Sequence, residues 1–421
     1  MHDAAKSNAT LAERRDRFRN GWARGLAEQV AHGPMRAFTR RDAGADLSKR
    51  LSWFRADRRL IVVAGPYRTA KDVDLALAHG LRHAGANEML VLVIPDDEKV
   101  SRATLARSPW IDRDLEIYTF DLAAVEYGKS VVVSAQPIEK RSRVLQLYRD
   151  DPPGGWGYGI GAPPRPTDHE VVLNEKLAWV ADFTEWLETR DEIYTEHTEH
   201  YLAWRCAGTI VLKMTPGKHH VTIAAGIQHS RTGPLPLKVD CTGVLTETKR
   251  SELEGRVLEA VGSFPDGLAE RYREHRLQGV IAGQHPPILG LDPPLKSERA
   301  AWRPYPPDGR AFLDFLGVDH QGVLHIIETK VGEDAMMVLQ GLDYWIWATA
   351  NRDGLATEFG LRNGVSAVEV DFLVDGGKGK LLGPYSKAQS LALADEVVHR
   401  FWEIRDWESG HEPAIDRLTF G

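Results

Sequence analysis

Two neighbouring segments in the C-terminal third of the chain carry acidic residues and a lysine. Asp314 lies in the apolar run AFLDFLGV, and Glu328 and Lys330 lie near the end of the run GVLHIIETKV. Side chains alternate between the two faces of a strand, so Glu328 and Lys330 share one face and Thr329 points to the other. Residues 319–322, Asp-His-Gln-Gly, suit a hairpin turn. We therefore expect a hairpin that brings Asp314 beside Glu328.

This arrangement points to metal-assisted chemistry on phosphate. Two carboxylates held close together oppose each other's ionisation unless a cation lies between them. Mg²⁺ and Mn²⁺ accept such oxygen ligands and retain waters, and a bound divalent ion polarises a phosphate and lowers the pKa of a bound water. The ammonium group of Lys330 would orient that water or stabilise charge that develops on the phosphate. The three residues are thus a candidate centre for phosphodiester hydrolysis.

The acidic-x-Lys triplet alone is a weak signal, because chance examples are expected in a chain of this size. Two others occur, at residues 97–99 and 247–249. The first follows Pro95 and has left its strand, whereas the second has Asp240 only seven residues before it, which leaves little room for a hairpin. The alternative for the third triplet is a surface Glu–Lys pair beside a coincidentally buried aspartate. Its hairpin context favours the chemical interpretation.

The segment DFLGVDHQGVLHIIETK resembles the core of the PD-(D/E)XK nuclease superfamily. Its features are a strand that bears Asp, a turn that contains Gly, and an apolar strand that ends in Glu-x-Lys. Farther along, Gln340 and Tyr344 resemble the Gln-x-x-x-Tyr signature of the RecB-type branch, and the resemblance covers roughly residues 250–400. Leu313 stands where the superfamily has the proline of its name.

The resemblance implies an α/β fold with a mixed sheet flanked by helices, and Mg²⁺ or Mn²⁺ as the cofactor. Asp314, Glu328 and Thr329 would be the metal ligands, and Lys330 would be the catalytic lysine.

Two further expectations come from this resemblance. Gln340 and Tyr344, four residues apart on one helix face, would support the site or contact the nucleic-acid backbone, although ordinary helix packing is the alternative. The family often has a glutamate in a helix before the sheet. Glu254 or Glu252 could take that place, and Glu254 is preferred because it flanks the apolar stripe of its helix. His325, on the opposite strand face from Glu328, is expected to be a core histidine.

The rest of the chain is expected to form smaller units. Residues 1–150 read as a basic N-terminal helix followed by strands alternating with helices, which is typical of a small parallel α/β layer. Residues 151–168, rich in Pro and Gly, read as an exposed linker. Residues 169–249 suggest a helix and a β-hairpin, and residues 250–421 the nuclease-like domain, with a final helix over 386–404. No internal repeat is evident in the sequence.

Composition sets broad limits. The net charge of −7 argues mildly against a nucleic-acid partner, but residues 1–60 hold 14 Lys and Arg against 7 Asp and Glu. No run approaches the roughly 18 apolar residues of a membrane helix. The N-terminus lacks the apolar segment of a secretory signal, and only two cysteines are present. We therefore expect a cytoplasmic protein without a membrane partner.

These observations lead to an expected function. The leading hypothesis is a metal-dependent DNA endonuclease in defence (restriction) or DNA repair, in which the N-terminal and middle regions recognise the target or form a homodimer. The alternatives are an RNA-directed nuclease and a non-catalytic nucleic-acid or protein-binding module that retains the nuclease fold. Cleavage that requires Mg²⁺ and stops with EDTA would separate the enzyme from the binding module.

Overall fold

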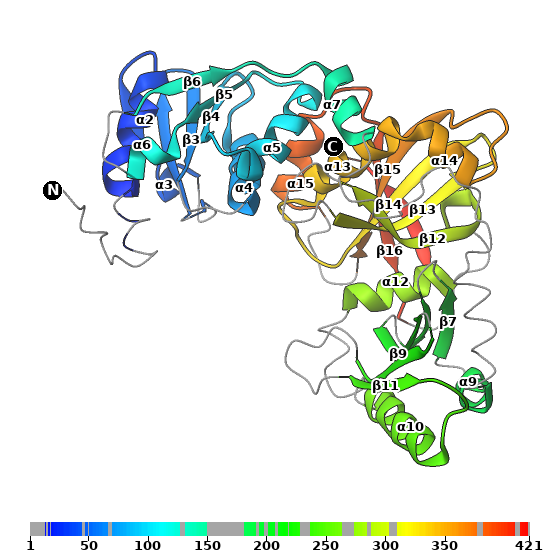
Figure 1. Ribbon diagram of the computed structural model, residues 1–421. Coiled ribbons are helices and arrows are strands. Elements are labelled where there is room, and N and C mark those ends of the chain that lie inside the picture. Colours follow the sequence, from blue (N-terminus) through cyan, green and yellow to red (C-terminus); the bar gives the residue numbers. More distant parts are fainter. Residues whose placement is uncertain are drawn as a thin grey trace.

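Three β-sheets, one in each third of the sequence, organise the chain (Figure 1). In the computed structural model the described residues are 13, 16, 18–43, 47–48, 50–65, 70–126, 131–149, 181–190, 193–197, 201–206, 209–217, 219–227, 236–262, 273–283, 288–302, 310–376, 382–408 and 413–419. The expected linker at 151–168 lies outside these residues.

The first sheet has six strands in sequence order, coloured blue to cyan in Figure 1. Its strands are β1 (Met35–Ala37), β2 (Leu51–Ala56), β3 (Arg59–Ala64), β4 (Met89–Pro95), β5 (Leu115–Phe120) and β6 (Val133–Gln136). The central strands β3, β4 and β5 are parallel, and the others join antiparallel. Helix α2 (Ala23–Val30) packs on one face, and the crossover helices α4 (Ala70–His83) and α5 (Glu98–Arg107) follow β3 and β4. The continuous apolar runs of β3 and β4 suit strands buried on both faces.

The middle sheet is antiparallel and has five strands. Its strands are β7 (Ile193–His197), β8 (Leu202–Cys206), β9 (Thr209–Pro216), β10 (Val221–Ala225) and β11 (Leu237–Cys241), with helices α9 (Ala181–Glu188) and α10 (Glu247–Gly262). The domain boundary expected at residue 250 falls inside helix α10. The buried face of that helix, with Leu253 and Val257, packs into the core of the middle sheet.

The third sheet again has six strands in sequence order, coloured yellow to red in Figure 1. They are β12 (Leu291–Trp302), β13 (Arg310–Asp319), β14 (Val323–Lys330), β15 (Ala367–Asp375), β16 (His399–Arg405) and β17 (Ala414–Leu418). Strands β14, β15 and β16 are parallel and the outer pairs are antiparallel. Helix α12 (Arg273–Gly283) packs on β14, and α13 (Met337–Ala350) crosses from β14 towards β15. The expected α/β class, with mixed sheets flanked by helices, is confirmed.

The hairpin between β13 and β14 forms at the expected turn. The amide of Gly322 donates to the carbonyl of Asp319 at 3.0 Å, and Gly322 has φ of 74°, a left-handed conformation that favours glycine. The Asp319 carboxylate accepts the amides of Gln321 and Val323, each at 2.9 Å. These bonds set the register that pairs Phe315 with Ile327, one step nearer the turn than Asp314 and Glu328.

The prediction of a helix over residues 386–404 is wrong. The chain forms a short helix, α15 (Pro384–Ser390), and then strand β16. The apolar residues Val397, Phe401 and Ile404 have helical spacing, but β16 pairs with β15 and the Phe401 ring stacks on Phe372 at 4.9 Å. Pairing with a neighbouring strand overrides local propensity here.

Two junctions join the three units. Helices α4 and α5 of the first unit pack against α15 and α13 of the third, and buried side chains of both units form one continuous core. Helix α12 lies between the third sheet and the middle sheet, where it contacts β14 on one side and β8 and β9 on the other (Figure 1).

Candidate active site

Asp314 is held by the residue that follows Glu328. Both the backbone amide and the hydroxyl of Thr329 donate to Asp314 Oδ2, at 2.7 and 2.6 Å. Burial raises the pKa of Asp314, and the two bonds from Thr329 offset only part of that rise. The hairpin therefore delivers a fixed, desolvated carboxyl group next to the end of β14.

Glu328 lies deeper, with 1% of its surface exposed. Its Oε2 accepts a hydrogen bond from Gln340 Nε2 at 3.2 Å, whereas its buried Oε1 has no hydrogen-bond partner within the described chain. Burial raises the pKa of Glu328 well above its usual range, the charge of Asp314 raises it further, and Lys330 lowers it only in part. Ionised Glu328 is therefore unfavourable unless a further cation joins Lys330 beside it.

Lys330 reaches across to a residue that the sequence did not single out. Its Nζ lies 2.9 Å from Glu274 Oε1, on the first turn of α12. Burial would lower the pKa of Lys330, but the charge of Glu274 outweighs this effect and the pKa is raised. The ammonium group thus stays protonated at neutral pH.

The two signature residues of α13 connect the site to β13. One amide group, Gln340 Nε2, donates to Glu328 and lies 3.1 Å from the Tyr344 hydroxyl, which in turn donates to the carbonyl of Phe312 at 2.8 Å. Tyr344 is 2% exposed. Gln340 therefore supports Glu328 directly, and the buried Tyr344 holds Gln340 against β13.

The side chain of Thr329 is occupied in orienting Asp314. Its hydroxyl also accepts a hydrogen bond from Gln278 Nε2 at 3.2 Å, and Gln278 Oε1 lies 3.1 Å from His275 Nδ1. A polar chain thus runs from α12 to Asp314. Thr329 was expected among the metal ligands, which stays a prediction; its hydroxyl and amide fix the orientation of the Asp314 carboxyl group.

The structure does not bring Glu254 to this group. Glu254 lies on α10, is paired with Arg250 at 2.9 Å, and belongs to the helix that packs on the middle sheet. Glu274 on α12, the helix directly before the third sheet, takes the expected position instead. Its spacing of four residues from Gln278 on a helix next to β12 was the signal that could have identified it.

His325 lies on the opposite face of β14, as expected, and is buried. Its Nδ1 lies 2.6 Å from Asp371 Oδ2, and Trp402 Nε1 donates to the other oxygen of Asp371 at 2.6 Å. Burial would lower the pKa of His325, but the bond and charge of Asp371 outweigh it and the pKa is raised.

The donor set suits an ion that keeps part of its water shell. In the described part of the chain, no group of three or more His, Cys, Asp or Glu side chains is arranged to hold a metal ion. Asp314 and Glu328 supply two adjoining carboxyl groups, fewer than a closed cage requires. Mg²⁺ commonly binds through one or two carboxylates together with waters and substrate phosphates. The partnerless Oε1 of Glu328 is the kind of buried oxygen that such an ion would satisfy.

Comparison with known proteins does not assign the chain to a family. No family model matches the chain, and no relative was found among the curated proteins. Among the described helices, none is long and apolar enough to cross a membrane.

Proposed function

We propose that the third unit is a divalent-metal-dependent nuclease of the PD-(D/E)XK type that hydrolyses phosphodiester bonds in DNA. The observation that carries the proposal is the buried, partnerless Oε1 of Glu328 beside Asp314 and Lys330. The order of helix α12, hairpin β13–β14, crossover helix α13 and parallel strand β15 supports it, because the resemblance implies a mixed α/β core.

A purely structural role for these side chains explains the geometry less well. A buried polar group without a partner costs about 1–3 kcal/mol, and an unpaired buried charge costs more. Glu328 has an unsatisfied oxygen and a neighbouring carboxyl group that raises its pKa further. A core that needed only stability would be better served by an apolar side chain at this position. A bound cation removes the cost.

The position of the group in the sheet also fits a ligand site. Glu328 and Lys330 lie at the carboxyl end of β14, which runs parallel to β15. In open α/β sheets, ligands bind beyond the carboxyl ends of such strands. The loop that leads from Lys330 into α13 begins at the same edge.

Each side chain has a separate task in the proposed reaction. Asp314 and Glu328 offer oxygens to a divalent ion, which when bound polarises the phosphate and lowers the pKa of a bound water. Lys330, kept protonated by Glu274, is available to orient the attacking water or to stabilise charge on the phosphate. Gln340 orients Glu328, and Thr329 orients Asp314.

The test is cleavage of a panel of DNA and RNA substrates with Mg²⁺, with Mn²⁺ and with EDTA. DNA cleavage should require the metal, should be lost in Glu328→Gln and Lys330→Ala, and should persist in the control Asp353→Asn, an exposed acid on α14 (Arg352–Glu358). Cleavage of RNA alone would redirect the proposal to an RNA nuclease. Binding of DNA without cleavage under any metal would overturn it in favour of a non-catalytic module.

A further inference from the structure

The first and third sheets have the same topology, although no repeat is visible in the sequence. Both have six strands in sequence order, and in both the successive pairings are antiparallel, antiparallel, parallel, parallel and antiparallel. An identical series of five pairings in two sheets of one chain indicates two copies of one fold.

The helices match as well. In each unit a crossover helix of 14 residues joins the third strand to the fourth: α4 in the first unit and α13 in the third. On the opposite face lies the helix that precedes the sheet. Leu26 of α2 packs with Ile61 and Val63 of β3, and Leu277 of α12 packs with Ile327 of β14. Sheet and covering helices therefore correspond on both faces.

The two units contact each other reciprocally. The first crossover helix of each unit packs against the second crossover helix of the other: α4 against α15, and α13 against α5. Such an exchange of partners is the property of a two-fold, isologous interface, in which one element contacts another and the second contacts the first. The arrangement of the four helices between the two sheets can be followed in Figure 1.

A short bridge marks the centre of this pseudo-twofold. Ile111 and Leu393, each just beyond the second crossover helix of its unit, form an isolated antiparallel bridge. Two backbone hydrogen bonds flank it, from Asp112 N to Ala392 O at 2.8 Å and from Ala394 N to Trp110 O at 2.9 Å. Exchange of the two units converts one of these bonds into the other, so equivalent segments meet at the axis.

The strand faces give a residue-level correspondence for Glu328. Along β14, Leu324 and Ile326 face α13, and Glu328 continues that alternation. Along β3, Leu60, Val62 and Ala64 face α4 in the same core. The parallel pairing with the next strand begins at Arg59 in β3 and at Val323 in β14, so the residue five positions further on is Ala64 in one copy and Glu328 in the other.

The neighbours of Ala64 complete the comparison. Leu51 of β2 pairs with Ala64 and so corresponds to Asp314. Gly65 follows Ala64 in the place of Thr329, and the next residue in the sequence is Pro66 in place of a lysine. A Cβ on Gly65 would lie 3.0 Å from the Phe18 ring, which thus packs where Gln278 contacts Thr329 in the other copy.

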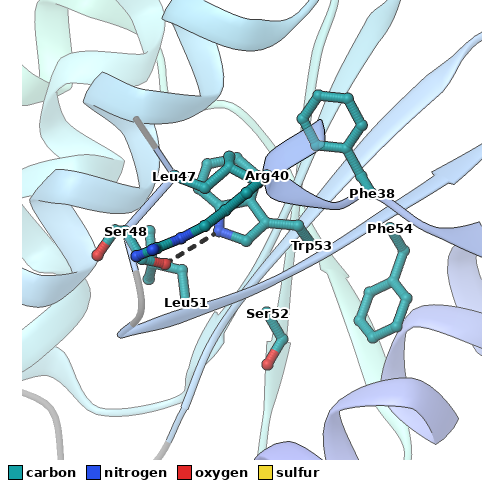
Figure 2. A pocket seen from close by; sticks show the side chains of 8 residues that line it. All are labelled: Phe38, Arg40, Leu47, Ser48, Leu51, Ser52, Trp53 and Phe54. Carbon is teal, nitrogen blue, oxygen red and sulfur yellow. Dashed lines mark hydrogen bonds between the residues drawn. The ribbon is translucent and has the colours of Figure 1, made fainter. Parts of the chain in front are cut away.

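A largely apolar hollow lies beside Leu51, the counterpart of Asp314, in the first unit (Figure 2). It has a volume of about 270 Å³, and none of its described lining residues is acidic: Phe38, Arg40, Leu47, Ser48, Leu51, Ser52, Trp53 and Phe54. Asp72, on α4, is paired with Arg50 at 3.0 Å. Among the described residues, this place therefore lacks a pair of adjoining carboxyl groups like Asp314 and Glu328.

We infer that residues 18–136 are a catalytically silent copy of the C-terminal fold and that the two copies pair within one chain around a single reactive centre. The inference rests on the proposed function for its consequence: a monomer cuts one strand of a duplex in each encounter, and nicked DNA is the product. The two strands of a duplex are related by two-fold symmetry, so each copy of a symmetric pair would face one strand. Among the described residues, two adjoining carboxyl groups occupy this position only in the copy with Glu328.

Supercoiled plasmid tests this consequence. With Mg²⁺ or Mn²⁺, open circles should accumulate first, and linear DNA should appear only after a lag, through independent second nicks. Asp72→Asn, which removes a buried acid on α4 of the silent copy, should leave the nicking rate within twofold of the wild type. Direct formation of linear DNA by monomeric protein, without an open-circle intermediate, would overturn the inference.

Calorimetric titration with Mn²⁺ separates this inference from the proposed function. One class of site per chain, lost in Glu328→Gln and retained in Asp72→Asn, supports a single centre even if no nucleic acid is cleaved, in which case the proposed function alone fails. A site that survives Glu328→Gln and disappears in Asp72→Asn would place a second centre in the first unit and refute the inference. The absence of any Mn²⁺ site would refute it as well.

Discussion

One buried arginine links the two six-stranded units through carboxylates of both. Arg107 on α5 is 1% exposed. Its Nε and Nη2 lie 2.8 and 2.7 Å from the two oxygens of Asp343 on α13, and its Nη1 lies 2.7 Å from Asp74 on α4. Planar, bidentate pairing of this kind is among the stronger polar contacts in proteins. Burial raises the pKa of Asp74, and Arg107 opposes this rise.

Arg107→Met should destabilise the protein strongly. The substitution preserves most of the side-chain volume but leaves Asp74 and Asp343 buried without their shared cation. Loss of one partner from a buried ion pair costs about 3–5 kcal/mol. With an unfolding entropy of about 2.1 cal/mol/K per residue over 421 residues, this corresponds to a Tm about 3–6 °C lower.

Urea unfolding followed by circular dichroism and tryptophan fluorescence measures the change. Asp343→Asn, which leaves Arg107 paired with Asp74, should cost less than Arg107→Met. Replacement of all three residues by apolar ones should restore much of the loss, since a buried triad can be exchanged for hydrophobic packing at little net cost. A loss below about 1 kcal/mol in Arg107→Met would refute the assignment of Arg107 as the centre of the junction.

Three further predictions concern the third unit. Lys330→Ala should reduce cleavage by at least about 100-fold but retain the rise in Tm on addition of Mn²⁺. Asp314→Ala should lose both the cleavage and the rise in Tm. Undiminished cleavage by Lys330→Ala would place the active site elsewhere. Glu328→Gln should abolish the Mn²⁺ response in the same melting experiment without lowering the metal-free Tm, because the neutral amide needs no compensating cation; a lower metal-free Tm would count against the explanation. The pKa of His325 is raised above 6.5, so its bond to Asp371 contributes stability that is fully present below pH 6.5 and declines as pH rises through the folded-state value. Asp371→Asn should therefore lower Tm more at pH 6 than at pH 9, and an equal loss at both would contradict this.

Much of the candidate site could be read from the sequence because its rules are local. Alternation along a strand places Glu328 and Lys330 on one face, and the turn at residues 319–322 sets the register that brings Asp314 next to them. The spacing of Gln340 and Tyr344 likewise places both on one helix face. Each of these relations spans fewer than about 20 residues.

Other features were decided by tertiary structure. The acidic partner of Lys330 depends on which helix packs against the third sheet. That helix is α12, so the partner is Glu274 rather than Glu254 on α10. Val397, Phe401 and Ile404 have helical spacing, but residues 399–405 form a strand because they pair with β15. Long-range pairing supplies free energy that no local pattern reports.

The duplication of the fold is the clearest case of this division. The sequence determined where apolar runs, turns and chemically active side chains lie, because strands, helices and hairpins follow short-range periodicity. Only the three-dimensional pairing of the strands revealed that β1–β6 and β12–β17 share one topology, and that Ala64 stands where the other copy has Glu328. The physical reason is that buried positions require apolar character and volume rather than particular residues, so two copies can keep one fold after their sequences have lost any visible similarity.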